Sequence, residues 1–158
     1  LNRPAFALYG RSLPGFARRA IRAADLVVIE SGTALAFFDT VRRVNPRART
    51  LYFCRDLLKS VGAAPALQLA EARAIPQFDL VCVPSAMLGQ QLPPGGRVQV
   101  IPQGIDTELF DRPNASPYPA GTKNAVSVGN MLFDELSVAQ MAQAAPEVQF
   151  HIFGAHWK

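Results

Sequence analysis

Hydrophobic residues along the chain gather in short runs that are separated by longer, more mixed segments. Apolar runs that are rich in β-branched residues or alternate with polar ones predict strands. Six such runs occur, at residues 25–30, 50–54, 79–84, 97–102, 125–129 and 148–154. The segments at residues 33–44, 64–75, 85–92 and 133–145 predict helices. The pattern therefore predicts an α/β fold.

The order of these segments indicates how the strands pair. Most of the strand runs are continuously apolar, which is typical of strands buried on both faces of a sheet, and strands joined by helices pair in parallel through right-handed crossovers. We expect Ser31 or Thr33 to cap the first helix and Ser85 the third. Asn45-Pro46 and Pro76 are expected to end the first and second helices.

One segment interrupts the alternation and predicts a linker. Residues 111–124 contain three prolines and a glycine and show no apolar periodicity. We therefore expect residues 1–110 to form the end of one α/β domain and residues 125–158 to form the start of another.

Charge is distributed unevenly along the chain. The overall net charge is +4, but residues 1–60 carry +7 and residues 61–158 carry −3. Arg18, Arg19 and Arg22 lie in a predicted helix of the basic half. A solvated face explains them as well as an anionic membrane surface does. A nucleic acid is disfavoured, because few aromatic residues are interleaved and no recognised binding motif is present.

Cysteine and histidine positions argue against a metal or disulfide framework. Cys54 and Cys82 both lie inside apolar runs and are expected to be buried, reduced side chains. His151 and His156 lack the spacing of metal ligands. No apolar run approaches the roughly 18–20 residues of a membrane-spanning helix. The chain begins with Leu1 and not with a methionine, so we expect it to be a piece of a longer protein.

Candidate chemistry is concentrated in the residues that follow each predicted strand. In parallel sheets, ligands bind beyond the carboxyl ends of the strands. Asp56 follows the second strand, and from its chemistry alone it could be a solvated loop acid, a helix cap or a catalytic base. Gln103, Gly104 and Asp106 form a turn after the fourth strand.

A strand–glycine–helix sequence follows the fifth strand. Gly129 would let a ligand approach the backbone, and the helix start behind it offers unpaired N–H groups to a phosphate. Asn130 and Met131 complete this turn, where Met131 is either core packing or an apolar contact for a nucleobase. A plain strand–helix turn explains the same residues.

Taken together, several motifs carry a resemblance to a known family. The chain contains "DLVVIESGTALAFFDTVRRVNPRA", "DLVCVPSAM", "QGID", "SPYPAG", "AVSVGNMLFD" and "PEVQFHIFG", in that order. It resembles glycosyltransferases of the B fold, in which two Rossmann-like domains face each other across a cleft. More closely, it resembles the xanthan-type β-glucuronosyltransferase family, at similar spacing over most of residues 24–154.

The resemblance implies a reaction and a place for it. Members transfer glucuronate from UDP-glucuronate to a lipid-linked oligosaccharide in exopolysaccharide synthesis. They act as peripheral proteins at the cytoplasmic face of the inner membrane, where Arg18, Arg19 and Arg22 would face the anionic surface. The transfer inverts the anomeric configuration and needs neither metal nor cofactor.

The resemblance also implies roles for particular residues. Counting on from "NPRA", the general base of the family corresponds to Asp56. The methionine beside the donor uracil corresponds to Met131, with Gly129 and Asn130 on the same donor-binding turn. Gln103, Gly104 and Asp106 would lie at the cleft or hinge, near the end of the acceptor domain at residues 1–110 and before the linker at residues 111–124.

Two other functional classes remain open from the sequence. A retaining B-fold glycosyltransferase shares the Gln-Gly-Ile-Asp type of turn, and a non-catalytic α/β binding module would need no base at Asp56. The further donor-binding residues of the family lie beyond Lys158. We therefore expect this chain to be inactive on its own.

Overall fold

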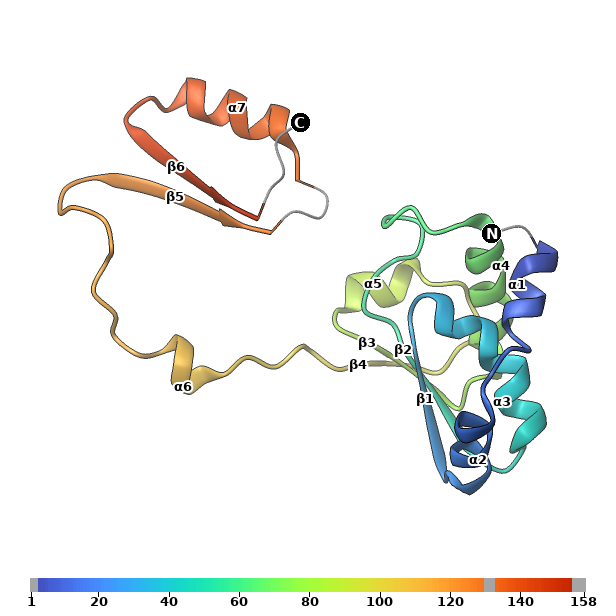
Figure 1. Ribbon diagram of the computed structural model, residues 1–158. Coiled ribbons are helices and arrows are strands. Elements are labelled where there is room, and N and C mark those ends of the chain that lie inside the picture. Colours follow the sequence, from blue (N-terminus) through green and yellow to red (C-terminus); the bar gives the residue numbers. More distant parts are fainter. Residues whose placement is uncertain (1–2, 130–132, 155–158) are drawn as a thin grey trace. The chain divides into compact units, whose positions relative to one another are not determined.

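The computed structural model describes residues 3–129 and 133–154 of the chain. It divides into two compact units, Leu1–Gly104 and Ile105–Lys158, and each contains its own parallel sheet (Figure 1). The predicted α/β class with parallel sheets is confirmed.

The first unit is built on a four-stranded sheet in the order β1-β2-β3-β4. All neighbouring strands are parallel, and Tyr52 is in register with Ile29 on one side and with Val81 on the other. Because each strand lies beside the next one along the chain, every connection is a crossover of the same kind. The strands are β1 (Leu26–Glu30), β2 (Arg49–Phe53), β3 (Leu80–Val83) and β4 (Val98–Val100).

Helices connect these strands and precede the first of them. Two of them, α1 and α2, precede β1, and α1 falls where no helix was predicted from the sequence. The elements are α1 (Arg3–Tyr9), α2 (Gly15–Ala23), the 3₁₀ helix η1 (Thr33–Phe37), α3 (Phe38–Val44), α4 (Pro65–Ala74), the 3₁₀ helix η2 (Ile75–Gln77) and α5 (Ala86–Gln91).

The helix caps differ in part from the prediction. Neither Ser31 nor Thr33 caps the helix after β1, because the chain enters α3 directly from η1, and Gly32 precedes η1 without a side-chain cap. Ser85 does cap α5, since its Oγ accepts a hydrogen bond from the Leu88 N–H at 3.2 Å. The expected ends of the first two helices are confirmed, at Val44 and Ala74.

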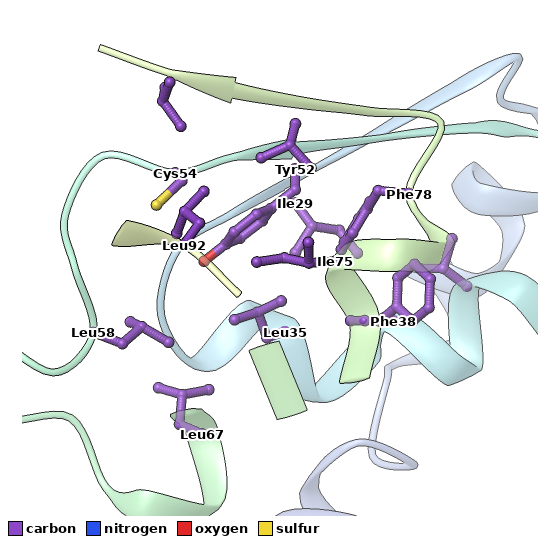
Figure 2. Close-up of a cluster of buried hydrophobic side chains, with 14 residues drawn as sticks. Ile29, Leu35, Phe38, Tyr52, Cys54, Leu58, Leu67, Ile75, Phe78 and Leu92 are labelled. Carbon is purple, nitrogen blue, oxygen red and sulfur yellow. The ribbon is translucent and has the colours of Figure 1, made fainter. Parts of the chain in front are cut away.

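The hydrophobic core lies between the sheet and its helices. Tyr52 is fully buried at the centre, and its ring stacks on Phe78 with centroids 5.3 Å apart. Phe38, at the start of α3, contacts the same Phe78 ring at 4.4 Å. Figure 2 shows these rings beside Ile29 and Ile75. Cys54 and Cys82 are buried free thiols, as predicted.

The expectation that the strands are buried on both faces is wrong for β1 and β4 of the first sheet. Every residue of β4 is exposed because β4 is the edge strand, and Val98, in register with the buried Val81, is still 42% exposed. Leu26 and Val28 on β1 lie on the face away from the core and are 53% and 52% exposed. The physical reason is topological, because consecutive strands joined by crossovers of one hand carry their connecting helices on one face.

Hydrogen bonds from side chains stabilise the edge of this sheet at which the strands begin. Asn45 donates from Nδ2 to the carbonyls of Ile21 and Ala24, both at 2.9 Å. Asp79 accepts from the Thr50 N–H at 2.8 Å and pairs with Arg49 at 2.9 Å. The Thr50 N–H and then the Arg49 guanidinium hold the pKa of Asp79 below its usual range. These polar groups therefore stabilise the fold through hydrogen bonds and an ion pair.

The second unit holds a two-stranded parallel sheet. In it, α6 (Thr107–Phe110) precedes β5 (Lys123–Val128), and α7 (Glu135–Ala144) connects β5 to β6 (Val148–Phe153). Asp134 caps α7, accepting from the Ser137 N–H at 3.1 Å. The short helix α6 was not predicted, and its cap is Asp106, which accepts from the Leu109 N–H at 3.0 Å.

Candidate active site

The turn after β2 places Asp56 at the carboxyl edge of the first sheet. Cys54 continues the ladder, because its N–H donates to the Cys82 carbonyl at 2.9 Å. The next N–H, that of Arg55, donates to Ser31 Oγ at 3.1 Å, which joins this turn to the end of β1. The backbone that carries Asp56 is thus held by two neighbouring strands.

The Asp56 side chain is exposed, while its backbone is held. Cys54 Sγ donates to the Asp56 carbonyl at 3.4 Å, and Leu58 behind it is buried in the core. Among the described residues, no side chain or N–H forms an ion pair or hydrogen bond with the Asp56 carboxylate, and Arg55 does not pair with it. A carboxylate that is exposed, carried on a held backbone and unpaired among the described residues is a candidate proton acceptor.

A buried polar pair lies behind this turn. The Tyr52 hydroxyl donates to Glu71 Oε1 on α4, and the Glu71 side chain is buried. Burial raises the pKa of Glu71, while the Tyr52 hydrogen bond lowers it in part. Burial also raises the pKa of the Tyr52 hydroxyl, and it raises that of the Cys54 thiol to about 11.

Glu71 was missed by the sequence reasoning. It lies in a predicted helix, where an acid is ordinarily solvated. The available signal was its position, four residues after Leu67 and three before Ala74, which are both buried on the same face of α4. An acid on an apolar helix face needs a buried partner, and here Tyr52 provides it.

A cavity of about 410 Å³ opens beside the Asp56 turn. Two of its lining residues, Leu57 and Leu58, directly follow Asp56, and its polar lining includes amide, carboxyl and ammonium groups. Such a mixed lining suits a ligand with several hydroxyl groups. The cavity is lined by Leu57, Leu58, Lys59, Ser60, Gln68, Glu71, Gln91, Leu92 and Pro93.

The residues after β4 lie where the chain passes from one unit to the other. Gln103 and Gly104 end the first unit, and both are exposed. Asp106 belongs to the second unit, where its carboxylate is engaged as the cap of α6. The turn predicted from these residues is therefore a boundary between units followed by a capped helix.

The glycine turn after β5 is described only at its first residue. Gly129 is exposed and has a φ of 131°, which favours glycine, and its N–H donates to the Phe153 carbonyl at 2.8 Å. Asn130 and Met131, which were predicted to contact the donor, lie outside the described residues.

The three arginines of α2 differ in their surroundings. Arg18 is partly buried, and its guanidinium donates to the carbonyls of Leu13 at 3.0 Å and Arg11 at 2.8 Å. Arg19 and Arg22 are exposed. Arg18 therefore stabilises the connection between α1 and α2, whereas the other two are available to a partner.

Residues 3–129 and 133–154 contain neither a cluster of metal ligands nor a membrane-spanning helix. No three side chains of histidine, cysteine, aspartate or glutamate gather there as metal ligands do. No helix in that part of the chain has the length and apolar character needed to cross a bilayer.

The fold and the site define an α/β domain whose parallel sheet presents a carboxylate, unpaired among the described residues, at its carboxyl edge, the edge at which ligands bind in sheets of this class. The family described as "Glucuronosyltransferase GumK, N-terminal domain" matches residues 1–84, more than half of the chain. The chain belongs to this family.

A curated relative extends the similarity beyond the family match. It is the UDP-glucuronate:glycolipid 2-beta-glucuronosyltransferase of Xanthomonas campestris pv. campestris, which is 33% identical over 135 residues. The alignment covers 85% of this chain and 34% of the relative. The chain thus spans about a third of the length of the curated relative that it matches.

Proposed function

We propose that the full-length gene product is an inverting glucuronosyltransferase that transfers glucuronate from UDP-glucuronate to a lipid-linked oligosaccharide, in exopolysaccharide synthesis. The observation that carries the proposal is the exposed carboxylate of Asp56 at the carboxyl edge of the sheet, which has no ion-pair partner among the described residues. The name of the Xanthomonas relative, which acts on a glycolipid, supports the donor and the acceptor class.

In the proposed reaction, Asp56 is the general base. Inversion requires one carboxylate to take the proton from the acceptor hydroxyl while that oxygen attacks the anomeric carbon opposite the leaving nucleotide. The 410 Å³ cavity, which is lined by Leu57 and Leu58 directly after Asp56, would hold the sugar that carries this hydroxyl. Gln68 and Lys59 on its wall would contact neighbouring sugar hydroxyls.

In the proposed enzyme, the second unit would contribute to binding of the donor UDP-glucuronate. We assign residues 1–110 to the acceptor domain of a glycosyltransferase B fold, residues 111–124 to a linker and residues 125–158 to the start of the donor domain. Gly129, Asn130 and Met131 would contact the UDP moiety. Gln103, Gly104 and Asp106 would lie at the cleft between the two domains.

The stereochemistry of the product tests the inverting mechanism. UDP-glucuronate carries glucuronate in the α configuration, so we expect a β-linked product when the full-length protein is incubated with donor and lipid-linked acceptor. NMR of the product reads the configuration directly. An α-linked product would instead assign the protein to the retaining enzymes, and failure to bind UDP in a titration would favour a non-catalytic module.

We also propose that the protein is peripheral to the cytoplasmic face of the inner membrane. Arg19 and Arg22 are exposed on α2, close in sequence to the exposed Phe16, and this combination suits an anionic lipid surface. We expect the R19E/R22E variant to lose cosedimentation with vesicles that contain phosphatidylglycerol. An R47E/R97E variant reverses the same charge elsewhere and should sediment as the unaltered protein does. Equal loss in both variants would reject a role for α2.

A further inference from the structure

A second cavity lies in the helical layer of the first unit. It has a volume of about 460 Å³ and is lined by residues of α1, η1, α3 and α4. Helices α1 and α4 lie side by side (Figure 1). None of its lining residues belongs to the Asp56 turn or to the cavity beside it. Its lining includes Phe6, Arg11, Asp39, Arg43, Leu69 and Arg73.

The wall that α1 contributes to this cavity is firmly anchored. Thr40 is buried on α3, and its Oγ1 donates to the Gly10 carbonyl at 2.6 Å. A Cβ at Gly10 would lie 2.2 Å from the Ala36 carbonyl oxygen, so only glycine permits this approach. The Tyr9 ring packs on Phe37 at 4.9 Å. The cavity is thus a built feature of the helix packing.

Positive charge on the cavity wall exceeds what its one carboxylate can neutralise. Asp39 pairs with Arg73 at 2.7 Å. Arg11 and Arg43 also line the cavity, and within the described part of the chain neither guanidinium has an ion-pair partner. The wall therefore carries two uncompensated guanidinium groups, whose planar, forked donors suit a phosphate.

The rest of the lining restricts what the phosphate can be attached to. Phe6 and Leu69 are apolar, as are Ala7, Ala36, Ala66 and Ala70 around them. A free phosphate would fill only a small part of 460 Å³ and would leave this apolar surface facing water. Leu69, which lines the cavity, is 52% exposed, so the apolar lining reaches the outer surface of α4.

We propose that this cavity binds a phosphate group carried on an apolar chain, with Arg11 and Arg43 on the phosphate and Phe6 and Leu69 on the chain. The site lies apart from the Asp56 edge and does not depend on the glucuronosyltransferase proposal. Its ligand class is that of an anionic lipid whose phosphate is exposed at the headgroup.

Calorimetric titration of the full-length protein with soluble, short-chain lipids tests the site. We expect dihexanoyl phosphatidic acid to bind at least about tenfold more tightly than inorganic phosphate, because only the lipid covers the apolar wall. We expect the R11A/R43A variant to weaken phosphatidic acid binding about tenfold or more. Phosphatidic acid binding should also weaken as salt is raised, because the contact is charged and partly exposed.

The matched control is R42A, which removes the neighbouring exposed arginine of α3 that does not line the cavity. It should leave the affinity for phosphatidic acid within about twofold. An L69E variant places a repelling carboxylate at an exposed position of the wall, and it should abolish binding without disturbing the core.

Three results would overturn the proposal. They are the absence of phosphatidic acid binding, equal binding by the unaltered and R11A/R43A proteins, and equal affinity for inorganic phosphate. Circular dichroism checks the fold of each variant, and the exposed L69E substitution decides the question if R11A/R43A does not fold. Glucuronate transfer is measured separately, so its failure would leave this result intact.

Discussion

The D56N variant of the full-length protein is expected to lose at least about a hundredfold in turnover number, measured with UDP-glucuronate and a lipid-linked acceptor. General-base catalysis by a positioned side chain contributes roughly 10²–10⁴-fold. An amide at the same place has nearly the same size but cannot take the proton of the acceptor hydroxyl. Because the Asp56 side chain is exposed and unpaired among the described residues, its replacement removes no structural contact.

The control for this variant is D25N, at the opposite edge of the same sheet. Asp25 is also exposed, and it directly precedes β1 at Leu26. D25N should retain its turnover within about twofold, and both variants should melt at the temperature of the unaltered protein. UDP binding by D56N, measured by titration, should be unchanged. Turnover of D56N close to that of the unaltered protein would reject the general-base role.

Most strands and helices of this fold could be predicted from the sequence, because they depend on patterns within short stretches of the chain. The strand runs, their parallel pairing and the Ser85 cap depend on periodicity, chain order and one side-chain hydrogen bond. The exposure of β1 and β4 was not predictable from their composition. Val28 and Val98 are as apolar as buried strand residues. Only the sheet order shows that the helices leave the face of Val28 uncovered and that Val98 belongs to an edge strand.

The candidate site likewise has one part that the sequence predicted and another part that it did not. The topology rule for parallel sheets directed attention to Asp56, and the structure places it at that edge, beside Ser31 from the neighbouring strand end. The two cavities, and the pairing of Tyr52 with Glu71, join residues from different helices and strands. Tertiary packing determines which residues meet in these features, and local sequence patterns do not specify that packing.

A second substitution tests the polar pair in the core. The Y52F variant is expected to lower the free energy of unfolding by about 1–3 kcal/mol, because it leaves the buried Glu71 carboxyl without its hydrogen-bond donor. Urea unfolding, followed by circular dichroism, measures the change. Y9F removes the same hydroxyl from a 42% exposed ring, and it should change the free energy by less than about 0.5 kcal/mol.

The loss in Y52F should also grow as pH rises. Burial raises the folded pKa of Glu71, so its contribution to stability is full below the unfolded pKa of about 4.3 and is lost as pH rises through the folded value. The Tyr52 hydrogen bond opposes this shift. Its removal raises the pKa of Glu71 further, and Y52F should therefore be less stable relative to the unaltered protein at a pH of about 8 than at about 5.

An E71Q background isolates the carboxyl group as the source of this pH dependence. Glutamine does not titrate, so the difference in stability between E71Q and E71Q/Y52F should be the same at both pH values. If Y52F shows one constant loss in the presence of Glu71 as well, the carboxyl group does not gain a proton on folding. The pair would then be a simple hydrogen bond, and the pH dependence would have to arise elsewhere in the chain.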